Sequence, residues 1–425
     1  MKTALACVLA LCIVLPAHAQ TIAPRESVGR IADVIQQQYF DEAKAAKIAA
    51  DLRAEAGRGT YDKLTDPRDF ASVMTDRLRP LDGHFAVSWT PPAAAAARTA
   101  GAPRRAPQPA RDNYGFRAVE VLPGNIGYVD LRRFAHFEPE GDQSAREAAD
   151  AAMALVARTD AVVFDLRDNG GGSPAMVGYL VGHFVPEGAD IYNTFKSRGA
   201  PDASERPTVP IRGKRRLDTP VYVLTSGRSA SAAEAFAYTL QAAGRATIVG
   251  EASAGGANPG DSNPVGDGLA VFVSNGAPIN PITRKNWEGT GVIPEVKVPA
   301  SQALERAQQL ALTQLVARPL GEPAATENRW ALEALTARGK APPADLARYA
   351  GAYGAYQVAY EGERLVLRRD RRPPNVLLPL AEPGLFTVEG APFRRIKFED
   401  GAMVMLSPDG GAARQARNSV AATVN

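Results

Sequence analysis

Two stretches of sequence indicate the architecture of this protein: AVVFDLRDNGGG, residues 161–172, and VYVLTSGRSASAAEAFA, residues 221–237. In each, a short apolar run ends in a turn of glycines and small polar residues, and a helical pattern follows. Apolar runs of this length are typical of strands buried in a parallel sheet. A strand, a turn and a helix, repeated, predict an α/β layer structure.

The same alternation extends over residues 113–300, which we interpret as one α/β core. It predicts further strands at 126–131, 247–249 and 269–274, and helices at 145–157 and 175–184. Two helical segments that follow, at 302–316 and 325–337, lie in a predicted connector over residues 301–340.

The regions on either side of the core have different patterns. Residues 20–90 are expected to form a helical domain, because Val28, Ile31, Ile35 and Tyr39 recur at three- and four-residue steps. Residues 91–112, rich in proline, alanine and arginine, are typical of a solvated linker. Residues 341–425 contain short strand-like runs between turns and predict a small all-β domain with a frayed tail after Ser407.

Composition limits the class of protein. The chain has 425 residues, 45% of them hydrophobic and 22% charged, as in a globular protein of two or three domains. Lys and Arg number 49 against 46 Asp and Glu, a net charge of +3 that does not favour nucleic-acid binding.

The N-terminus has the pattern of a cleavable export signal. Lys2 precedes an apolar run over residues 4–16, and Ala17-His18-Ala19 fits a cleavage site. We expect residues 1–19 to be removed and the mature protein to be periplasmic or secreted, with no stable membrane insertion. Both cysteines leave with this segment, so no disulfide or thiol chemistry is predicted.

Both indicative stretches could carry chemistry. Glycines 170–172 let the backbone turn tightly and expose amides that favour an anion or an oxyanion. Ser231 stands at a predicted helix start, where a nucleophile would gain from the helix amides. An alternative is structural, because Ser231 and Glu234 have the spacing of a capping box.

A catalytic serine needs a base, and the expected mature chain has three histidines: His84, His136 and His183. His183, near the end of an apolar helix, has a structural interpretation, and local chemistry does not choose between the other two. We predict no metal and no cofactor, because neither a paired-histidine motif nor a nucleotide-binding glycine pattern occurs.

Taken together, these segments resemble one family of serine peptidases. The family contains the C-terminal processing (tail-specific) proteases, the core of the tricorn protease and the repeats of interphotoreceptor retinoid-binding protein. Residues 165–172 resemble its motif D-x-R-x-N-G-G, and residues 229–237 resemble S-A-S-A-x-E. Order and spacing agree over about residues 115–300. The resemblance implies βαβ layers of the ClpP/crotonase type.

The resemblance implies a serine peptidase of the tricorn and retinoid-binding branch. The tail-specific proteases pair their serine with a lysine 25 residues later, where this chain has Gly256. The implied catalytic residues are Ser231 as nucleophile, His84 as base and Glu288 in the relay. The implied oxyanion hole is formed by the amides of Gly170, Gly171 and Ala232.

The implied partner is a protein or peptide substrate, hydrolysed by an endopeptidase or processing peptidase. The linker at 91–112 is too short for a PDZ-type peptide-binding module, so recognition of carboxyl-terminal tails does not carry over. The C-terminal domain could cap the cleft or mediate assembly into a homo-oligomer. The alternative is a non-catalytic protein that binds a lipid or retinoid on the same fold.

Overall fold

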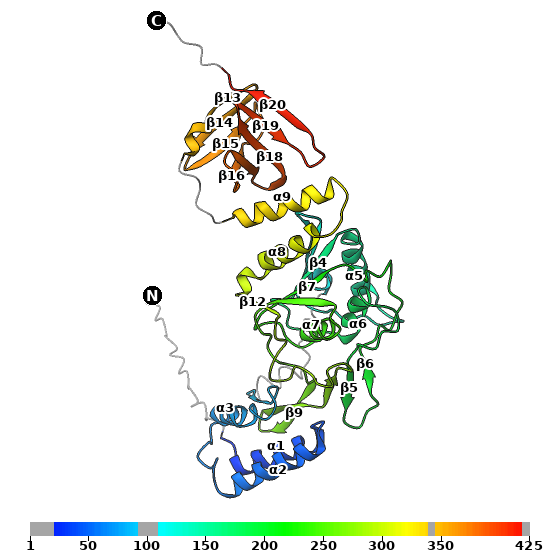
Figure 1. Ribbon diagram of the computed structural model, residues 1–425. Helices are drawn as coiled ribbons and strands as arrows, with labels where there is room; N and C mark the ends of the chain where they lie inside the picture. The colour runs from blue at the N-terminus through cyan, green and yellow to red at the C-terminus, as the bar shows by residue number, and fades with distance from the viewer. Residues whose placement is uncertain (1–20, 92–108, 339–344, 419–425) are drawn as a thin grey trace, which may run out of the picture. The chain divides into compact units, whose positions relative to one another are not determined.

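A computed structural model describes residues 21–91, 109–338 and 345–418 (Figure 1). The expected export signal and most of the expected linker lie outside these residues. The chain forms two compact units. Of the described residues, unit 1 contains 21–91, 196–201 and 258–277, and unit 2 contains the rest.

Unit 1 begins with the expected helices: α1 Pro24–Gln38, α2 Glu42–Gly57 and α3 Pro67–Leu78. On α1, Val28, Ile31 and Ile35 are fully buried, as their spacing predicts. The start of α3 also follows the sequence, because the Asp66 carboxylate accepts a hydrogen bond from the Arg68 amide at 2.8 Å.

Unit 1 also contains a sheet that the local pattern did not place there. Its strands are β1 Ala86–Trp89, β9 Gly260–Gly266 and β10 Leu269–Ser274, in the antiparallel order β1-β10-β9. The strand at 269–274, expected within the α/β core, pairs with residues far away in sequence: Ala86 faces Phe272, and Trp89 faces Leu269. Its apolar side chains join the core of the three helices.

Unit 2 is built on a six-stranded sheet of order β12-β8-β7-β4-β3-β2. Its strands are β2 Phe116–Leu122, β3 Ile126–Leu131, β4 Ala161–Asp165, β7 Val221–Thr225, β8 Ala246–Gly250 and β12 Val296–Lys297. All pairs are parallel except β2 with β3. A mixed α/β core is therefore confirmed.

Alternate residues of this sheet face two different helical layers. Val162 and Phe164 share a core with α5 Ser144–Leu155, α6 Pro174–Gly182 and α7 Ala232–Ala242. Ala161 and Val163 face α8 Ala303–Val316 and α9 Ala324–Ala337. Both faces are covered, which explains why the strands are continuous apolar runs.

Several short elements connect the larger ones. A third sheet has the order β11-β5-β6, with β5 Thr194–Ser197, β6 Ala203–Ser204 and β11 Gly276–Ile279. Among the described residues, 3₁₀ turns occur at 300–302 and 346–349. Residues 109–115 have 3₁₀ character that is interrupted by non-helical backbone at Asp112, Asn113 and Tyr114.

The C-terminal residues form an antiparallel near-barrel of eight strands in consecutive order. The strands are β13 Gly351–Tyr353, β14 Tyr356–Glu361, β15 Arg364–Arg368, β16 Asn375–Pro379, β17 Leu385–Val388, β18 Ala391–Glu399, β19 Ala402–Leu406 and β20 Ala412–Ala416. The first strand meets the end of the last through a bridge between Tyr353 and Arg417.

The expected frayed tail after Ser407 is wrong over the described residues. β20 pairs with β19 along its whole length, from Ala402 opposite Ala416 to Leu406 opposite Ala412. The sequence of β20 lacks apolar alternation because its side chains are mostly exposed. Backbone hydrogen bonds rather than burial hold this strand.

In the described part of the chain, no helix is long and apolar enough to cross a membrane.

Glu205 is a buried carboxyl group in unit 2, and it should make the stability of this unit fall as pH rises. It is 2% exposed, and its Oε2 accepts a hydrogen bond from Asn193 at 2.6 Å. Oε1 meets no donor among the described residues. Burial raises the pKa of Glu205 from 4.5 to about 8, against the hydrogen bond from Asn193, which lowers it. The contribution of the neutral carboxyl group to the free energy of unfolding is fully present below pH 4.5. It is lost progressively as the pH rises to about 8.

We expect Glu205→Gln to remove this contribution, because the amide does not ionise. Between pH 4.5 and 8.5, the free energy of unfolding of the wild type should fall by up to about 5 kcal/mol relative to that of the variant. Urea unfolding of both proteins across this range measures the difference. Parallel curves for the two proteins would contradict the assignment.

Candidate active site

The two indicative stretches end side by side in unit 2. β4 and β7 are parallel neighbours, and Asp165 pairs with Leu224 at their carboxyl ends. Residues 166–173 follow β4, and residues 226–231 follow β7. Ligand sites of open parallel sheets lie at this edge.

Asp165 and Arg167 anchor the first loop. Arg167 donates to Asp165 through Nε at 2.8 Å and also to the Ala300 carbonyl at 2.6 Å, and the Tyr128 hydroxyl donates to Asp165 at 2.8 Å. Burial raises the pKa of this carboxyl, but the hydrogen bonds and charge of Arg167 outweigh it and leave the pKa lowered. Asp165 is therefore a buried anion with a structural role.

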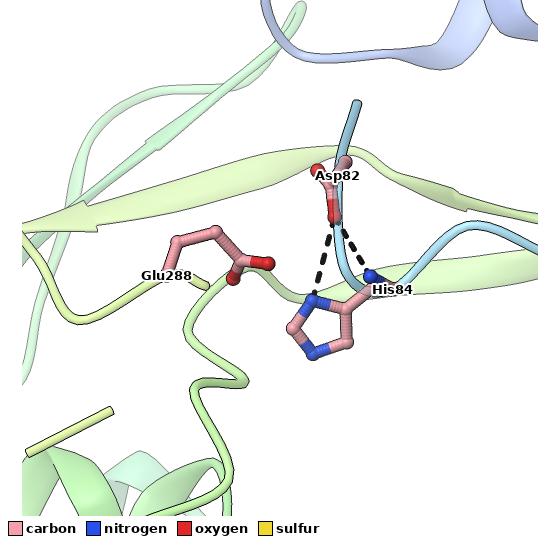
Figure 2. Close-up of side chains that lie close together, drawn as sticks. All are labelled: Asp82, His84 and Glu288. Carbon is pink, nitrogen blue, oxygen red and sulfur yellow. Dashed lines mark hydrogen bonds and ion pairs between the residues drawn. The ribbon is translucent and has the colours of Figure 1, made fainter. Parts of the chain in front are cut away.

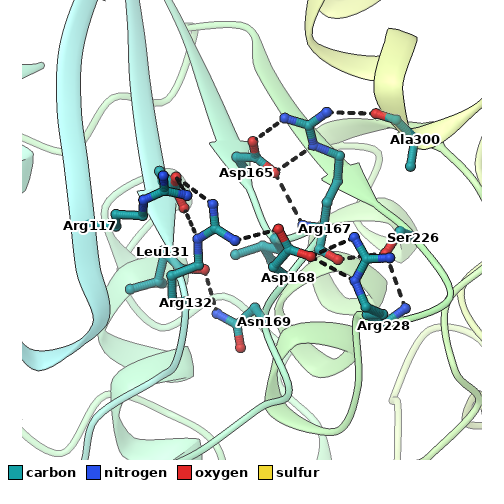
Figure 3. A network of polar contacts seen from close by, with 12 residues as sticks. Arg117, Leu131, Arg132, Asp165, Arg167, Asp168, Asn169, Ser226, Arg228 and Ala300 are labelled. Atoms are coloured by element: carbon teal, nitrogen blue, oxygen red, sulfur yellow. Dashed lines mark hydrogen bonds and ion pairs between the residues drawn. The ribbon is translucent and has the colours of Figure 1, made fainter. Parts of the chain in front are cut away.

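Asp168 joins the two loops (Figure 3). Arg228, from the second loop, donates to it through Nε at 2.7 Å, and Arg132 donates to its other oxygen. The hydrogen bond from Arg228 is the main cause that lowers the pKa of this carboxyl. The bridge fixes the second loop against the first.

Short hydrogen bonds involving serines and Asn169 complete the junction. The Ser226 hydroxyl donates to the Arg167 carbonyl at 2.5 Å, and the buried Ser229 hydroxyl donates to the Leu166 carbonyl at 2.7 Å. Asn169 accepts from the Ala230 amide at 3.0 Å through its carbonyl. The first serine of the S-A-S sequence is thus structural.

Ser231 differs from the serines before it. Its side chain is exposed, and its backbone has φ 53° and ψ −119° at the start of α7. A positive φ in a residue with a side chain costs about 1–3 kcal/mol and persists only where the surroundings enforce it. Strain at this position is common where a nucleophile must project from a strand-to-helix turn.

Glu234 enforces that conformation. It is fully buried, and its Oε2 accepts from the amides of Ser231 at 2.8 Å and Gly256 at 2.9 Å. Its Oε1 accepts from the Gly255 amide and the Ser253 hydroxyl, both at 2.6 Å. The carboxylate half of the predicted capping box is therefore present. It also ties α7 to the loop at residues 253–256.

The glycine turn lies directly against Ser231. A Cβ atom at Gly171 would stand 2.7 Å from the Ser231 Cβ and 3.1 Å from the Ala232 nitrogen. The Gly171 amide itself donates to the Asn169 side chain at 2.8 Å. Of the predicted oxyanion-hole amides, that of Gly171 is therefore engaged within its own loop. Ala232 is the first residue of α7, where helix amides have no partner in the helix.

Glu288 lies in a loop connected to the same network. Its Oε2 accepts from the Ala257 amide at 2.8 Å. The Ser253 hydroxyl that donates to Glu234 also accepts from the Val292 amide at 2.6 Å. The segments around Glu234 and Glu288 are thus held by shared contacts within unit 2.

His84 lies in unit 1, after the helices and just before β1. Asp82 accepts from the His84 amide at 2.9 Å, and its Oδ1 lies 3.6 Å from Nδ1 of the ring, as Figure 2 shows. The ring stacks on Phe272 of β10, with centroids 6.1 Å apart. A carboxylate at Nδ1 selects the tautomer that leaves Nε2 as the basic nitrogen.

The Asp82 carboxylate is itself fixed. It is 5% exposed and accepts from Asn258 at 3.3 Å. Burial raises its pKa, but hydrogen bonds, first from His84, outweigh this and lower the pKa to about 2. Asp82 was not among the predicted site residues. Its position two residues before His84 is the signal that could have identified it.

The other two histidines have local partners in unit 2. His136 contacts the Ser173 hydroxyl through Nδ1 at 2.8 Å and the Glu138 carboxylate through Nε2 at 2.5 Å. His183 is 3% exposed, and burial lowers its pKa to about 4. The structural interpretation of His183 agrees with this burial.

Comparison with known proteins identifies the core. The family model described as peptidase family S41 matches residues 125–298, which contain both loops and Ser231. Among solved structures, the chain is similar to a candidate peptidase from Parabacteroides merdae, with 20% identity over 68% of this chain and 97% of the other and a TM-score of 0.49. It is also similar to the photosystem II D1 C-terminal processing protease, with 18% identity over 66% and 94% of the two chains and a TM-score of 0.42.

The core with its paired loops is that of a serine peptidase. Residues 125–298, which form this core, match the model of peptidase family S41.

Proposed function

We propose that this protein is an exported serine endopeptidase or processing peptidase with Ser231 as nucleophile. One observation carries the proposal: Ser231 is exposed in a strained conformation at the start of α7, beside a glycine turn. A residue with only a capping role has no need of that strain. Export rests on the pattern of residues 1–19, and ClpP/crotonase-type layering rests on the family resemblance.

The reaction would proceed through a covalent acyl-enzyme. Ser231 Oγ attacks the peptide carbonyl while His84 Nε2 takes its proton and later returns it to the leaving amine. Asp82 holds the tautomer that this requires. Glu288 acts in the relay that orients and polarises the pair. The mechanism requires the imidazole to come within hydrogen-bond reach of Ser231.

The oxyanion would be stabilised by amides of the two loops. We assign this role to Ala232, at the start of α7, and to Gly170. Gly171 would contribute its own amide only if its hydrogen bond to Asn169 opened. Each such donor contributes about 2.7–4 kcal/mol to lowering the barrier.

Labelling with a tagged fluorophosphonate tests whether Ser231 is activated. We expect the wild type to be labelled, and we expect the label to be lost in both Ser231→Ala and His84→Ala. His136→Ala is the matched control, since its side chain contacts Ser173 and Glu138.

Two results would contradict the assignment. A folded wild type that takes no label would favour the alternative, a non-catalytic protein that binds a lipid or retinoid. Label that survives His84→Ala and disappears in His136→Ala would show that His136 is the base.

A further inference from the structure

The C-terminal near-barrel contains a cavity of about 650 Å³ at one of its mouths. Strands β15, β17 and β19 end at this mouth, and β16, β18 and β20 begin there, so one ring of strand ends surrounds the opening. Ligand sites for small molecules measure about 300–1,000 Å³. An eight-stranded barrel has room for side chains or for one small ligand.

The floor of the cavity is apolar. Leu367 of β15, Val388 of β17 and Ile396 of β18 line it and belong to the core of the near-barrel. Met405 of β19 lines the same wall and pairs with Ile396. Such a floor favours a hydrocarbon ligand, because each methylene group that leaves water for an apolar surface strengthens binding.

The rim of the cavity is cationic. Arg369, Arg372 and Arg394 line it, and no carboxylate pairs with any of these three among the residues that the structure describes. Arg369 is positioned by the Tyr356 hydroxyl, which accepts from its guanidinium at 2.8 Å. Two further lining arginines are already neutralised, Arg368 by Glu361 and Arg395 by Glu333.

The lining residues in the described part of the chain include five arginines and neither aspartate nor glutamate. A rim of unpaired guanidinium groups above an apolar floor complements a molecule with an anionic head and a hydrocarbon tail. Guanidinium groups recognise carboxylates through two parallel hydrogen bonds.

We propose that the near-barrel binds a long-chain fatty acid, with the carboxylate at Arg369, Arg372 and Arg394 and the chain on the apolar floor. This site is independent of Ser231 and goes beyond the proposed peptidase activity. It gives the C-terminal domain a ligand-binding role of its own.

Titration of the full-length protein with cis-parinaric acid, a fluorescent 18-carbon carboxylate, tests the proposal. We expect saturable binding of one probe per chain, displaced by oleate and not by methyl oleate. Arg369→Gln combined with Arg394→Gln should weaken binding at least about 10-fold, because two charge-assisted hydrogen bonds to the carboxylate are lost. Arg364→Gln is the matched control, since Arg364 begins β15 at the opposite mouth.

A second variant leaves the arginines in place and fills the cavity. Ala413 is exposed, lines the opening and pairs with Met405, so tryptophan at this position should block entry without disturbing the core. Ala413→Trp should abolish probe binding, and Ser231→Ala should bind as the wild type does. The experiments can therefore contradict the fatty-acid site without contradicting the proposed peptidase site, and the reverse.

Four outcomes would overturn the proposal, and the first three concern the probe. They are no saturable binding, equal displacement by methyl oleate, and binding that is unchanged in both Ala413→Trp and the double arginine variant. Arginine-dependent sedimentation with phosphatidylglycerol vesicles, without displacement by oleate, would assign the rim to a lipid headgroup and also overturn it.

Discussion

Ser231→Ala and His84→Ala should each lower kcat for a fluorescein-labelled casein by about 10⁶-fold, and the double variant should lose no more. This non-additivity is expected if Ser231 and His84 act as one unit, as proposed, because removing either then leaves only substrate binding and the proposed oxyanion hole. Asp82→Asn should cost about 10⁴-fold, since an amide can stabilise the wrong tautomer of His84 while preserving the packing.

The control for this series is His136→Ala, which removes an exposed imidazole from the same core. It should retain near-wild-type kcat. Additive losses in the Ser231 and His84 variants would mean that the two residues do not act in one mechanism. Circular dichroism of each variant separates loss of chemistry from loss of fold.

Gly171→Ala should abolish most hydrolysis, whereas Gly170→Ala, which keeps the backbone amide assigned to the oxyanion hole, should cost much less. At Gly171, φ is 110°, and a Cβ would stand 2.7 Å from the Ser231 Cβ and 2.9 Å from the Ala230 carbonyl oxygen. Positive φ adds about 1–3 kcal/mol of strain to this overlap. Ser231, the proposed nucleophile, must move, and a displacement of about 1 Å costs about 10²-fold in rate.

Gly170 provides a matched comparison one residue away. A Cβ atom at this position would have no atom within 4 Å, so the methyl group enters open space. Measuring kcat/KM and thermal unfolding for both variants separates the local effect from general destabilisation. Equal losses in the two variants would contradict a specific contact between Gly171 and Ser231.

Elements that depend on local pattern were predicted well. The strands at 126–131 and 221–225 and the helix from Ala232 agree with the sequence, because continuous apolar runs and a capped helix start are local signals. The membership of the core in a serine peptidase family was also expected, because two motifs occur in order at a fixed spacing.

Features that depend on distant partners were not predicted. The strand at 269–274 lies in unit 1 because it pairs with residues 86–89, and nothing within either segment specifies that partner. β20 was missed because an exposed strand needs only a neighbour for its backbone. The four contacts of the Glu234 carboxylate come from residues 19 to 22 positions away and from its own turn, so spacing revealed only the capping half.

The bridge between Tyr353 and Arg417 has a consequence for the lifetime of the protein among other proteases. β20 pairs with β19 on one side, and the residues that follow it contact β13 on the other. The Asn418 amide adds to this contact by donating to the Ala352 carbonyl at 2.8 Å. Exopeptidases need a few extended residues to begin digestion. An exopeptidase that reached Arg417 would have to separate β20 from β19 before it could continue. Separation would also leave strand edges with unpaired backbone groups, which promote aggregation.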